Sequence, residues 1–571
     1  MFAMFGAHPT RRSYAFHLVT WLILWTGIAS FSLTSVLRAS PQTADASSGL
    51  RAIIAAGKLS DLRWPDFSDY RAILESFYEP TRYQFAWIQN GQATPQARAV
   101  IGALKTSDLK GLTPDDYDAS RWDDRLAQLP SASPEQQALF DAALSVCAAR
   151  YISDLHIGKI NPQHFKFNLN VGPKKLDLAE FLRSNIVAAD PNKIQPEIDG
   201  VEPPFPGYAR TKAALQHYLA LARQDDGEKL PVPAKTVAPG DQYPGVPRLT
   251  RLLHLLGDLP ADAILPADSS VFAGPLVDAV KRFQFRHGLD ADGKLGAGTI
   301  KQLNVPLADR AKQLELTLER WRWVPYAFTS PPVVVNIPEF RLRAYNNQGQ
   351  PPLTMSVIVG RSVRTQTPVF ERDMKYIVFR PYWNVPISIQ RGEIVPAVTK
   401  NRNYIAQKNY EVTTPGGEVV TSGPISDEVL EQLRTGKLFV RQKPGPTNAL
   451  GLVKLMFPNE YNVYLHSTPS PQLFSQTRRD FSHGCIRVEK PAELAAWALR
   501  NNSGWDLARV EAAMKTGKDN VQVNLTQPIP VLILYGTAVV EDDGTVMFFD
   551  DIYGHDATLE KALAKGYPYP G

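Results

Sequence analysis

The chain has 571 residues, 44% hydrophobic and 21% charged, as in globular proteins with apolar cores. At about 150 residues per domain, this length predicts roughly three or four domains. The net charge is only +5, and three arginines among the first forty residues supply more than half of it. The composition therefore excludes a strongly basic nucleic-acid-binding protein, and no nucleic-acid partner is expected.

The N-terminal segment, residues 1–46, predicts export. Arg11 and Arg12 precede an apolar run of 25 residues, Ser13–Leu37, that contains no formally charged side chain. This pattern is typical of a secretory signal, and the run is also long enough to span a bilayer as an uncleaved anchor. We expect a membrane tether, with cleavage near Ala44-Asp45-Ala46 as the close alternative.

Residues 50–245 have the pattern of a helical domain. Apolar residues recur there at three- and four-residue spacing, which predicts amphipathic helices. The segments concerned are Tyr70–Phe77, Pro95–Leu104, Pro134–Ile152 and Leu176–Ile186. Cys147 lies in one of the apolar runs, so we predict a buried core residue rather than a disulfide partner of Cys485.

Residues 246–306 form a compact unit with a specific motif. A helix over Leu276–Phe285 is followed by an Asp-Gly turn at Asp290–Gly293 and a second short helix. The pattern V-x-x-F-Q-x-x-x-G-L-x-x-D-G-x-x-G-x-x-T, Val280 to Thr299, resembles the peptidoglycan-binding-1 module. That resemblance implies a small three-helix domain that binds cell-wall murein, with a helical unit that has lost its ligand as the alternative.

A linker helix is expected within residues 307–330, and residues 331–536 then have the pattern of a β-rich domain. The predicted strands are Val333–Ile337, Arg341–Tyr345, Thr354–Val359, Tyr376–Phe379, Tyr461–Leu465 and Val531–Tyr535. The strand pattern lapses between residues 387 and 443, which predicts an insertion that caps the site. Residues 537–571 are expected to form a C-terminal tail.

The stretch Ser482-His483-Gly484-Cys485 places a cysteine in a polar turn, where a structural thiol is unusual. A nucleophilic cysteine needs partial exposure, a base and backbone N–H groups, and Gly484 permits a turn whose N–H groups face an oxyanion. His466 and His483 are both candidate bases. No nearby side chain completes the usual zinc spacing, so no metal and no cofactor are expected.

The stretch His466-Ser467-Thr468, followed by Ser482-His483-Gly484-Cys485-Ile486-Arg487, resembles the L,D-transpeptidase catalytic-domain family. Pro381-Tyr382-Trp383-Asn384-Val385-Pro386 and Asn448-Ala449-Leu450-Gly451 extend the resemblance, and the domain order resembles the long-form periplasmic members. One departure is Ser467, where many members have glycine.

The resemblance implies a multidomain α+β fold: a helical scaffold, a three-helix peptidoglycan-binding module and a β-rich catalytic domain with a capping insertion. It implies Cys485 as the nucleophile and His466 as the proton donor and acceptor. The sequence leaves open which group orients His466, and a backbone carbonyl is the default expectation. The supporting residues are Gly484, Tyr464, His483, Arg487, Trp383 and Ser482. Tyr464 is expected to share a strand face with His466. Arg487 is expected either to brace the loop or to pair with a carboxylate, with a structural ion pair as the alternative.

The function implied is that of a murein L,D-transpeptidase in cell-wall biogenesis and cell shape, located in the periplasm and tethered to the inner membrane. Cys485 would attack the L-centre–D-Ala linkage of a tetrapeptide stem, and an amine of a second stem would resolve the thioester into a 3-3 cross-link. Partners would be donor and acceptor stems, with carbapenem-type β-lactams as covalent inhibitors. An L,D-carboxypeptidase and a non-catalytic wall-binding scaffold remain as alternatives.

Overall fold

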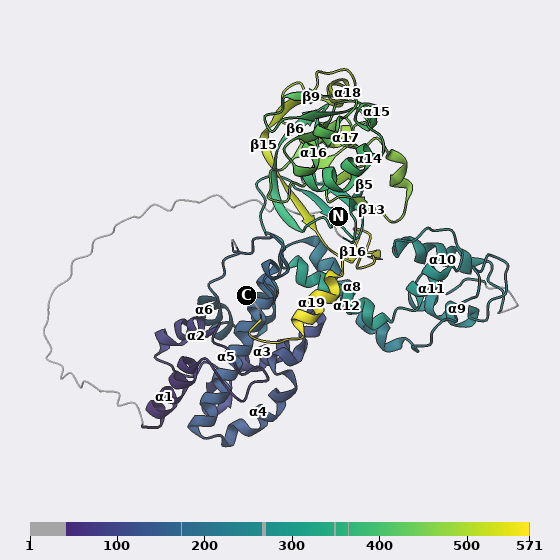
Figure 1. Ribbon diagram of the computed structural model, residues 1–571. Coiled ribbons are helices and arrows are strands. Elements are labelled where there is room, and N and C mark those ends of the chain that lie inside the picture. Colours follow the sequence, from purple (N-terminus) through teal and green to yellow (C-terminus); the bar gives the residue numbers. More distant parts are fainter. Residues whose placement is uncertain (1–40, 173, 265–269, 348–349, 364, 570–571) are drawn as a thin grey trace, which may run out of the picture.

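The computed structural model describes residues 41–569 except 173, 265–269, 348–349 and 364. A helical N-terminal body lies at one end of the molecule, a β-rich domain lies at the other, and a small helical module projects to the side (Figure 1). The apolar run predicted as a signal or anchor lies outside the described residues. None of the helices that are described combines the length and the apolarity needed to cross a membrane.

The N-terminal body is built around α5 (Pro134–Ile157), whose start is closed by a capping box between Ser133 and Gln136. Buried side chains surround α5 because α1, α3 and α6 pack against it. Cys147 of this helix is 1% exposed and has a free thiol, as predicted. The other elements are α1 (Pro41–Ala56), α2 (Arg71–Tyr78), β1 (Ile88–Gln89), β2 (Gln92–Ala93), α3 (Pro95–Lys105), α4 (Trp122–Gln128), α6 (Leu178–Phe181) and α7 (Ile194–Gly200).

A central layer joins the N-terminal body to the β-rich domain. It consists of α8 (Pro206–Gln224), α12 (Leu307–Trp321) and the hairpin of β16 (Ala538–Val540) and β17 (Val546–Phe548). Leu215, Leu314, Leu318 and Phe548 meet in one buried cluster. Helix α8 therefore packs on the linker helix and on a hairpin more than 300 residues away in sequence.

The projecting module contains α9 (Val246–Leu255), α10 (Pro275–Arg286) and α11 (Ala297–Leu303), in agreement with the predicted three-helix unit. Gln284 is 1% exposed, and its amide nitrogen donates to Asp292 at 2.9 Å and to Thr299 at 3.1 Å. Its amide oxygen accepts from the N–H of Gly293 at 2.8 Å. The Gln, the Asp-Gly turn and the Thr of the motif are thus one hydrogen-bonded unit.

The β-rich domain is a sheet that closes on itself. Its strand order is β13-β5-β14-β12-β11-β6-β15-β3-β4, and β4 also pairs with β5. The strands are β3 (Val333–Asn336), β4 (Arg341–Ala344), β5 (Leu353–Gly360), β6 (Phe370–Phe379), β11 (Val453–Met456), β12 (Leu465–His466), β13 (Asp480–Ser482), β14 (Ile486–Val488) and β15 (Val521–Leu534). Helices α17 (Pro491–Ala498) and α18 (Leu507–Lys515) pack on its core face.

The insertion between residues 387 and 443 is a small folded unit with strands, although the sequence pattern had suggested that strands lapse there. Its sheet has the order β7-β10-β8-β9. The elements are β7 (Trp383–Asn384), α13 (Ile387–Ile389), η9 (Gln390–Ile394), α14 (Val395–Lys400), α15 (Tyr404–Gln407), β8 (Tyr410–Thr413), β9 (Val419–Thr421), α16 (Asp427–Thr435) and β10 (Phe439–Gln442). β9 has only three residues, and the residues of β10, Phe-Val-Arg-Gln, do not alternate between apolar and polar, so the sequence does not mark them as strands.

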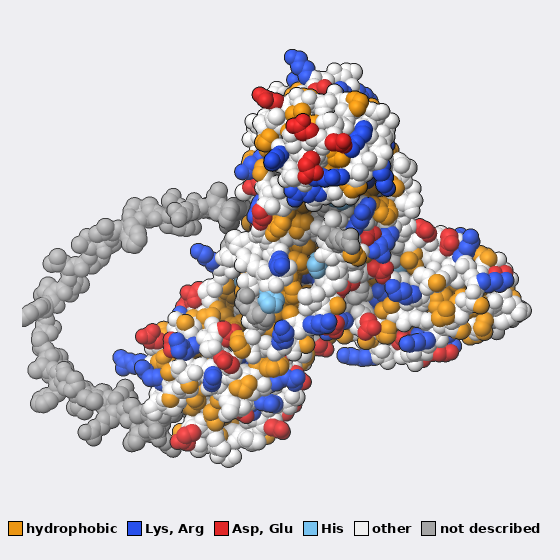
Figure 2. Space-filling view, in the orientation of Figure 1, with side chains coloured by type: hydrophobic (Ala, Val, Ile, Leu, Met, Phe, Trp, Pro, Cys, Tyr) orange, Lys and Arg blue, Asp and Glu red, His pale blue; other side chains and the backbone are white. Residues whose placement is uncertain are grey.

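The C-terminal segment returns to the N-terminal body. After α19 (His555–Leu563), Tyr567 is buried in the core of that body, and its hydroxyl donates to Asp154. The hydroxyl of Tyr569 donates to Asp116 at 2.9 Å. On the face seen in Figure 2, acidic and basic side chains are interspersed over all parts of the molecule, without a basic stripe of the kind that nucleic-acid binding requires.

Candidate active site

The register of β12 and β14 brings the two halves of the cysteine–histidine motif together. These strands pair in parallel, with Leu465 opposite Ile486 and His466 opposite Arg487. Leu465 and Ile486 are fully buried and face the core. Because side chains alternate along a strand, His466 and Arg487 lie on the opposite face, where Tyr464 and Cys485 extend the same two rows.

Cys485 is half-buried at the start of β14, and its thiol is free. The sulfur lies 3.6 Å from the carbonyl oxygen of Asn462, which accepts the weak S–H donor. Burial raises the pKa of the Cys485 thiol, although hydrogen bonds from Tyr464 and the charges of Arg487 and Lys454 act in the opposite direction. At neutral pH the resting group is therefore a thiol.

His466 is only 4% exposed, and its Nδ1 lies 2.6 Å from the carbonyl oxygen of Ser467. A carbonyl can only accept, so Nδ1 carries the proton and Nε2 remains available as the base. This agrees with the expectation that a backbone carbonyl orients the ring. Burial lowers the pKa of His466 to about 3, with a further contribution from Arg487, so the resting imidazole is neutral.

The catalytic turn is braced from within. The hydroxyl of Ser482 donates to the carbonyl of Cys485 at 2.6 Å and accepts from the N–H of Gly484 at 3.1 Å. Gly484 has a φ of +113°, a backbone conformation that side chains other than glycine rarely adopt. The N–H of Gly484 is thus already occupied, which contradicts the expectation that it faces an oxyanion; among the described residues, none accepts a hydrogen bond from the N–H of Cys485.

A buried threonine outside the sequence motifs supports the same turn. Thr367, 1% exposed, donates from Oγ1 to the carbonyl of Gly484 at 2.8 Å and accepts from the N–H of Gly360 at 2.9 Å. The hydroxyl of Tyr553 donates to the carbonyl of Gly360 at 2.6 Å, so the C-terminal segment also supports the turn. Thr367 and Tyr553 are far from Cys485 in sequence, and neither lies in a motif.

His483 points to the insertion rather than to Cys485. Its Nε2 lies 2.8 Å from Oε1 of Glu393, which belongs to the helical turn η9 of the insertion. We compared the insertion with the described residues of the catalytic domain that lie before residue 381 or after residue 449. The contact between His483 and Glu393 is the one hydrogen bond found between these two parts. Glu393 was not among the residues selected from the sequence.

The Asn448-Ala449-Leu450-Gly451 stretch supports the base. The fully buried amide of Asn448 donates to the carbonyls of Pro381 at 3.1 Å and Lys443 at 2.9 Å, and its oxygen accepts from the N–H of Leu450 at 2.8 Å. Gly451 has a φ of +63°, and a Cβ there would lie 2.5 Å from Oγ of Ser467. A glycine is therefore required behind the residue whose carbonyl orients His466.

Trp383 lies at the root of the insertion. It pairs with Gln442 between β7 and β10, and its ring centroid is 6.3 Å from that of Tyr410. The structure therefore places Trp383 against the core of the insertion. Within the described residues, no hydrogen bond or ring contact connects it to Cys485 or to His466.

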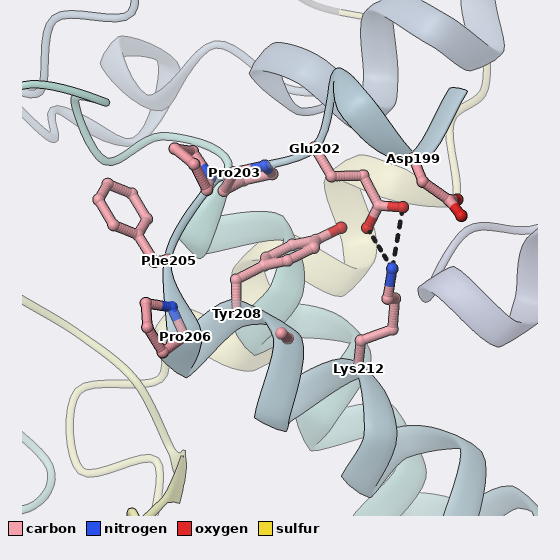
Figure 3. A pocket seen from close by; sticks show the side chains of 9 residues that line it. Asp199, Glu202, Pro203, Phe205, Pro206, Tyr208 and Lys212 are labelled. Atoms are coloured by element: carbon pink, nitrogen blue, oxygen red, sulfur yellow. Dashed lines mark hydrogen bonds and ion pairs between the residues drawn. The ribbon is translucent and has the colours of Figure 1, made fainter. Parts of the chain in front are cut away.

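A pocket of about 320 Å³ lies away from the catalytic domain, lined by the end of α7, residues 202–205 and the first turns of α8 (Figure 3). Glu202 in this pocket is neutralised by Lys212 at 3.0 Å and by Lys110. The pocket offers no nucleophile, and we assign it no role in catalysis. The described residues also contain no group of three or more His, Cys, Asp or Glu side chains arranged to hold a metal ion.

Three protein families match successive parts of the chain. Residues 72–215 match a scaffold domain, and residues 242–303 match the family described as "Putative peptidoglycan binding domain". Residues 331–533, which include Cys485, His466 and Thr367, match the L,D-transpeptidase catalytic domain. The catalytic region therefore belongs to the L,D-transpeptidase catalytic-domain family, and the chain joins it to a scaffold domain and a peptidoglycan binding domain.

A Haemophilus influenzae protein named "Putative L,D-transpeptidase" is 32% identical over 264 residues, which cover 46% of this chain and 51% of that protein. The chain thus matches about half the length of this curated relative. A solved L,D-transpeptidase from Xylanimonas cellulosilytica is 16% identical and matches 53% of this chain and 100% of its own. Its TM-score of 0.15 is too low to bear on the fold.

Proposed function

We propose that the protein is a murein L,D-transpeptidase that forms 3-3 cross-links through a thioester on Cys485. The observation that carries this proposal is the register of β12 and β14, which puts Cys485 and His466 in adjoining rows on one face of the sheet. The catalytic-domain family matched by residues 331–533 supports the same chemistry.

In the first half-reaction, Nε2 of His466 takes the proton of the Cys485 thiol as the sulfur attacks the carbonyl carbon of the L-centre–D-Ala linkage. The C–N bond then breaks, the proton passes from His466 to the leaving amine, and D-Ala departs. The carbonyl oxygen gains negative charge at the tetrahedral stage, where the N–H of Cys485 and the hydroxyl of Tyr464 are the candidate donors. The ring of Tyr464 lies 5.8 Å from that of His466.

In the second half-reaction, an amine of another stem attacks the thioester carbon and gives up its proton to His466. The C–S bond breaks and the proton returns to the sulfur, which restores the thiol. If water is the acceptor instead, the same steps hydrolyse the stem, and the enzyme is an L,D-carboxypeptidase.

The other segments of the chain support a proposed cell-wall partner and a proposed location of the protein. The peptidoglycan binding domain supports a cell-wall partner, and the export segment at the N-terminus supports a periplasmic location with a membrane tether. A carbapenem-type β-lactam is proposed to acylate the same sulfur, because its strained ring presents an amide carbonyl to the nucleophile.

The test is product analysis with purified tetrapeptide stems. The full chain should release D-Ala and produce cross-linked dimers by mass spectrometry, whereas a Cys485→Ala variant should do neither. Release of D-Ala with tripeptide as the sole other product would establish the hydrolase instead. Undiminished turnover by the Cys485→Ala variant would disprove the thioester.

A further inference from the structure

Three cationic side chains surround the catalytic turn without an acidic partner. Lys454 on β11 lies opposite His466, which in turn lies opposite Arg487 on β14, so all three share one face of the sheet. Arg361 follows the end of β5, and its N–H donates to the carbonyl of Ser482 at 3.1 Å. Among the described residues, no carboxylate lies within ion-pair distance of Lys454, Arg361 or Arg487, and no hydrogen bond from these three side chains is found. Nζ of Lys454 lies 5.7 Å from the centroid of the Tyr464 ring.

Arg487 is the least satisfied of these cations. Its side chain is half-buried, and its Nε is buried without a hydrogen-bond partner. Buried arginines elsewhere in the described residues have an oxygen acceptor: Arg286 pairs with Asp258, and Arg150 donates to the carbonyls of Trp64 and Asp66. No such acceptor is found for the side chain of Arg487 among the described residues. A partly buried guanidinium without a partner gains free energy when an anion pairs with it, so the arrangement at Arg487 suits a bound anion.

The cysteine does not supply that anion in the resting enzyme. Burial raises the pKa of Cys485, which keeps the sulfur neutral at physiological pH. Burial, together with the nearby charge of Arg361, lowers the pKa of Arg487, as expected for cations that lack a counter-ion. The site therefore carries an excess of positive charge beside an uncharged nucleophile.

We propose that Arg487, assisted by Arg361, binds a carboxylate of the donor stem peptide and thereby selects donors that carry a free carboxylate next to the attacked linkage. The inference rests on the proposed function, since it names the group that positions the donor on Cys485. A guanidinium can hold a carboxylate with two parallel N–H donors, which fixes the direction of the peptide as well as its charge. The donor offers the terminal carboxylate of the leaving D-Ala. It offers a second such group in stems where the residue in front of D-Ala is a diamino acid that carries its own free carboxylate.

The experiment compares three donors on the full chain: the free tetrapeptide, its C-terminal amide, and the peptide in which the diamino-acid carboxylate is amidated. The rate of release of D-Ala, or of its amide, is measured for each. The wild type should prefer the free acid over one of the amides by ~10–100-fold, the range for a hydrogen-bonded charge. The amide that is disfavoured identifies the carboxylate that is bound.

The Arg487→Gln variant should lose that preference, so that its acid-to-amide ratio approaches one, and Arg361→Gln should lower the ratio less. Removing the charge of Arg487 can also lower the reactivity of Cys485, but this lowers the rates with the acid and the amide donors alike. The ratio of the two rates is therefore unaffected by it. Arg487→Lys keeps the charge without the planar fork and should restore part of the preference. Arg500→Gln, at an exposed position after α17 on the core side of the sheet, is the matched control and should keep the wild-type ratio.

Equal rates with all three donors in the wild type, or an unchanged ratio in Arg487→Gln, would overturn the inference while leaving the proposed function intact. Acylation by a β-lactam verifies that each variant retains a folded site. A wild type that releases D-Ala from no donor would overturn the proposed function and the inference together.

Discussion

Nε2 of His483 lies 2.8 Å from Oε1 of Glu393, and this contact connects the catalytic turn to the insertion. The two residues are 90 positions apart, and both side chains are partly exposed. His483 precedes Gly484 and Cys485 in the catalytic turn, so the insertion contacts the same turn that carries the nucleophile. This placement favours His466 over His483 as the base and gives the insertion a direct influence on the site.

The first prediction concerns the insertion as a cap that keeps water from the thioester. Glu393→Gln should loosen the contact and raise the ratio of hydrolysed to cross-linked product by ~2–5-fold, the scale of one exposed charged contact. Chromatography of the products on one substrate measures the ratio. Glu418→Gln, exposed on the β8–β9 turn of the same insertion, is the control and should leave it unchanged.

A point substitution is a better test here than truncation. Val398, Ile405, Val412 and Leu433 are fully buried in a core that belongs to the insertion itself. Removing residues 404–436 would delete half of the buried side chains of that core and expose the remainder. A ratio unaffected by Glu393→Gln would mean that the contact does not govern access of water to the site.

The second prediction concerns the base. His466→Ala should lower the acylation rate by ~10²–10⁴-fold, the usual effect of losing a general base. His483→Ala should cost less, because its ring is turned to Glu393. Stopped-flow acylation by a chromogenic β-lactam measures both rates, and a larger loss in the His483 variant would reverse the assignment.

The third prediction concerns pH. Burial lowers the pKa of His466 to about 3 and raises that of Cys485, so imidazole and thiol are both neutral across the middle of the pH range. The second-order rate constant for acylation should therefore show no inflection near 6.5, the ordinary histidine value, and should rise at alkaline pH as the thiol ionises. Loss of half the rate on acidification through 6.5 would show that His466 titrates normally.

The fourth prediction concerns Thr367. Thr367→Val keeps the shape of the side chain but removes the hydroxyl from between Gly484 and Gly360, which leaves a buried carbonyl and a buried N–H unpaired. The free energy of unfolding should fall by ~1–3 kcal/mol, measured by chemical denaturation. Thr526→Val, at an exposed position of β15, should change it by less than about 0.5 kcal/mol. Equal effects of the two substitutions would rule out Thr367 as a brace.

Much of the fold follows from periodicity. The segments predicted as helices coincide with α2, α3 and α5, and the predicted Leu176–Ile186 is divided between the short α6 and a π-helix, η7 (Leu182–Val187). Strands form at the predicted Val333–Ile337, Arg341–Tyr345 and Thr354–Val359. The predicted strand Tyr461–Leu465 shrinks to Leu465–His466, because Asn462 takes a left-handed φ of +54°. Local sequence cannot show such a departure, since tertiary contacts decide it.

Some residues of the site can likewise be recognised from the sequence, and others cannot. Cys485, His466 and Ser482 are recognisable because they stand in a short motif whose residue types suit the chemistry. Thr367, Tyr553 and Glu393 are not, because a buried threonine or an exposed glutamate has no pattern until the fold brings it to the turn. Likewise, the sequence shows that Arg487 is present but not that it lacks a carboxylate partner.

The most direct test of the account is the intact mass of the protein after incubation with a carbapenem-type β-lactam, followed by peptide mapping. The wild type should gain the mass of one inhibitor molecule, located on Cys485, and Cys485→Ala should gain none. Cys147 provides an internal control, because it is 1% exposed and burial raises its pKa. An unmodified wild type, or an adduct that persists in the Cys485→Ala variant, would contradict the assignment of Cys485 as the nucleophile.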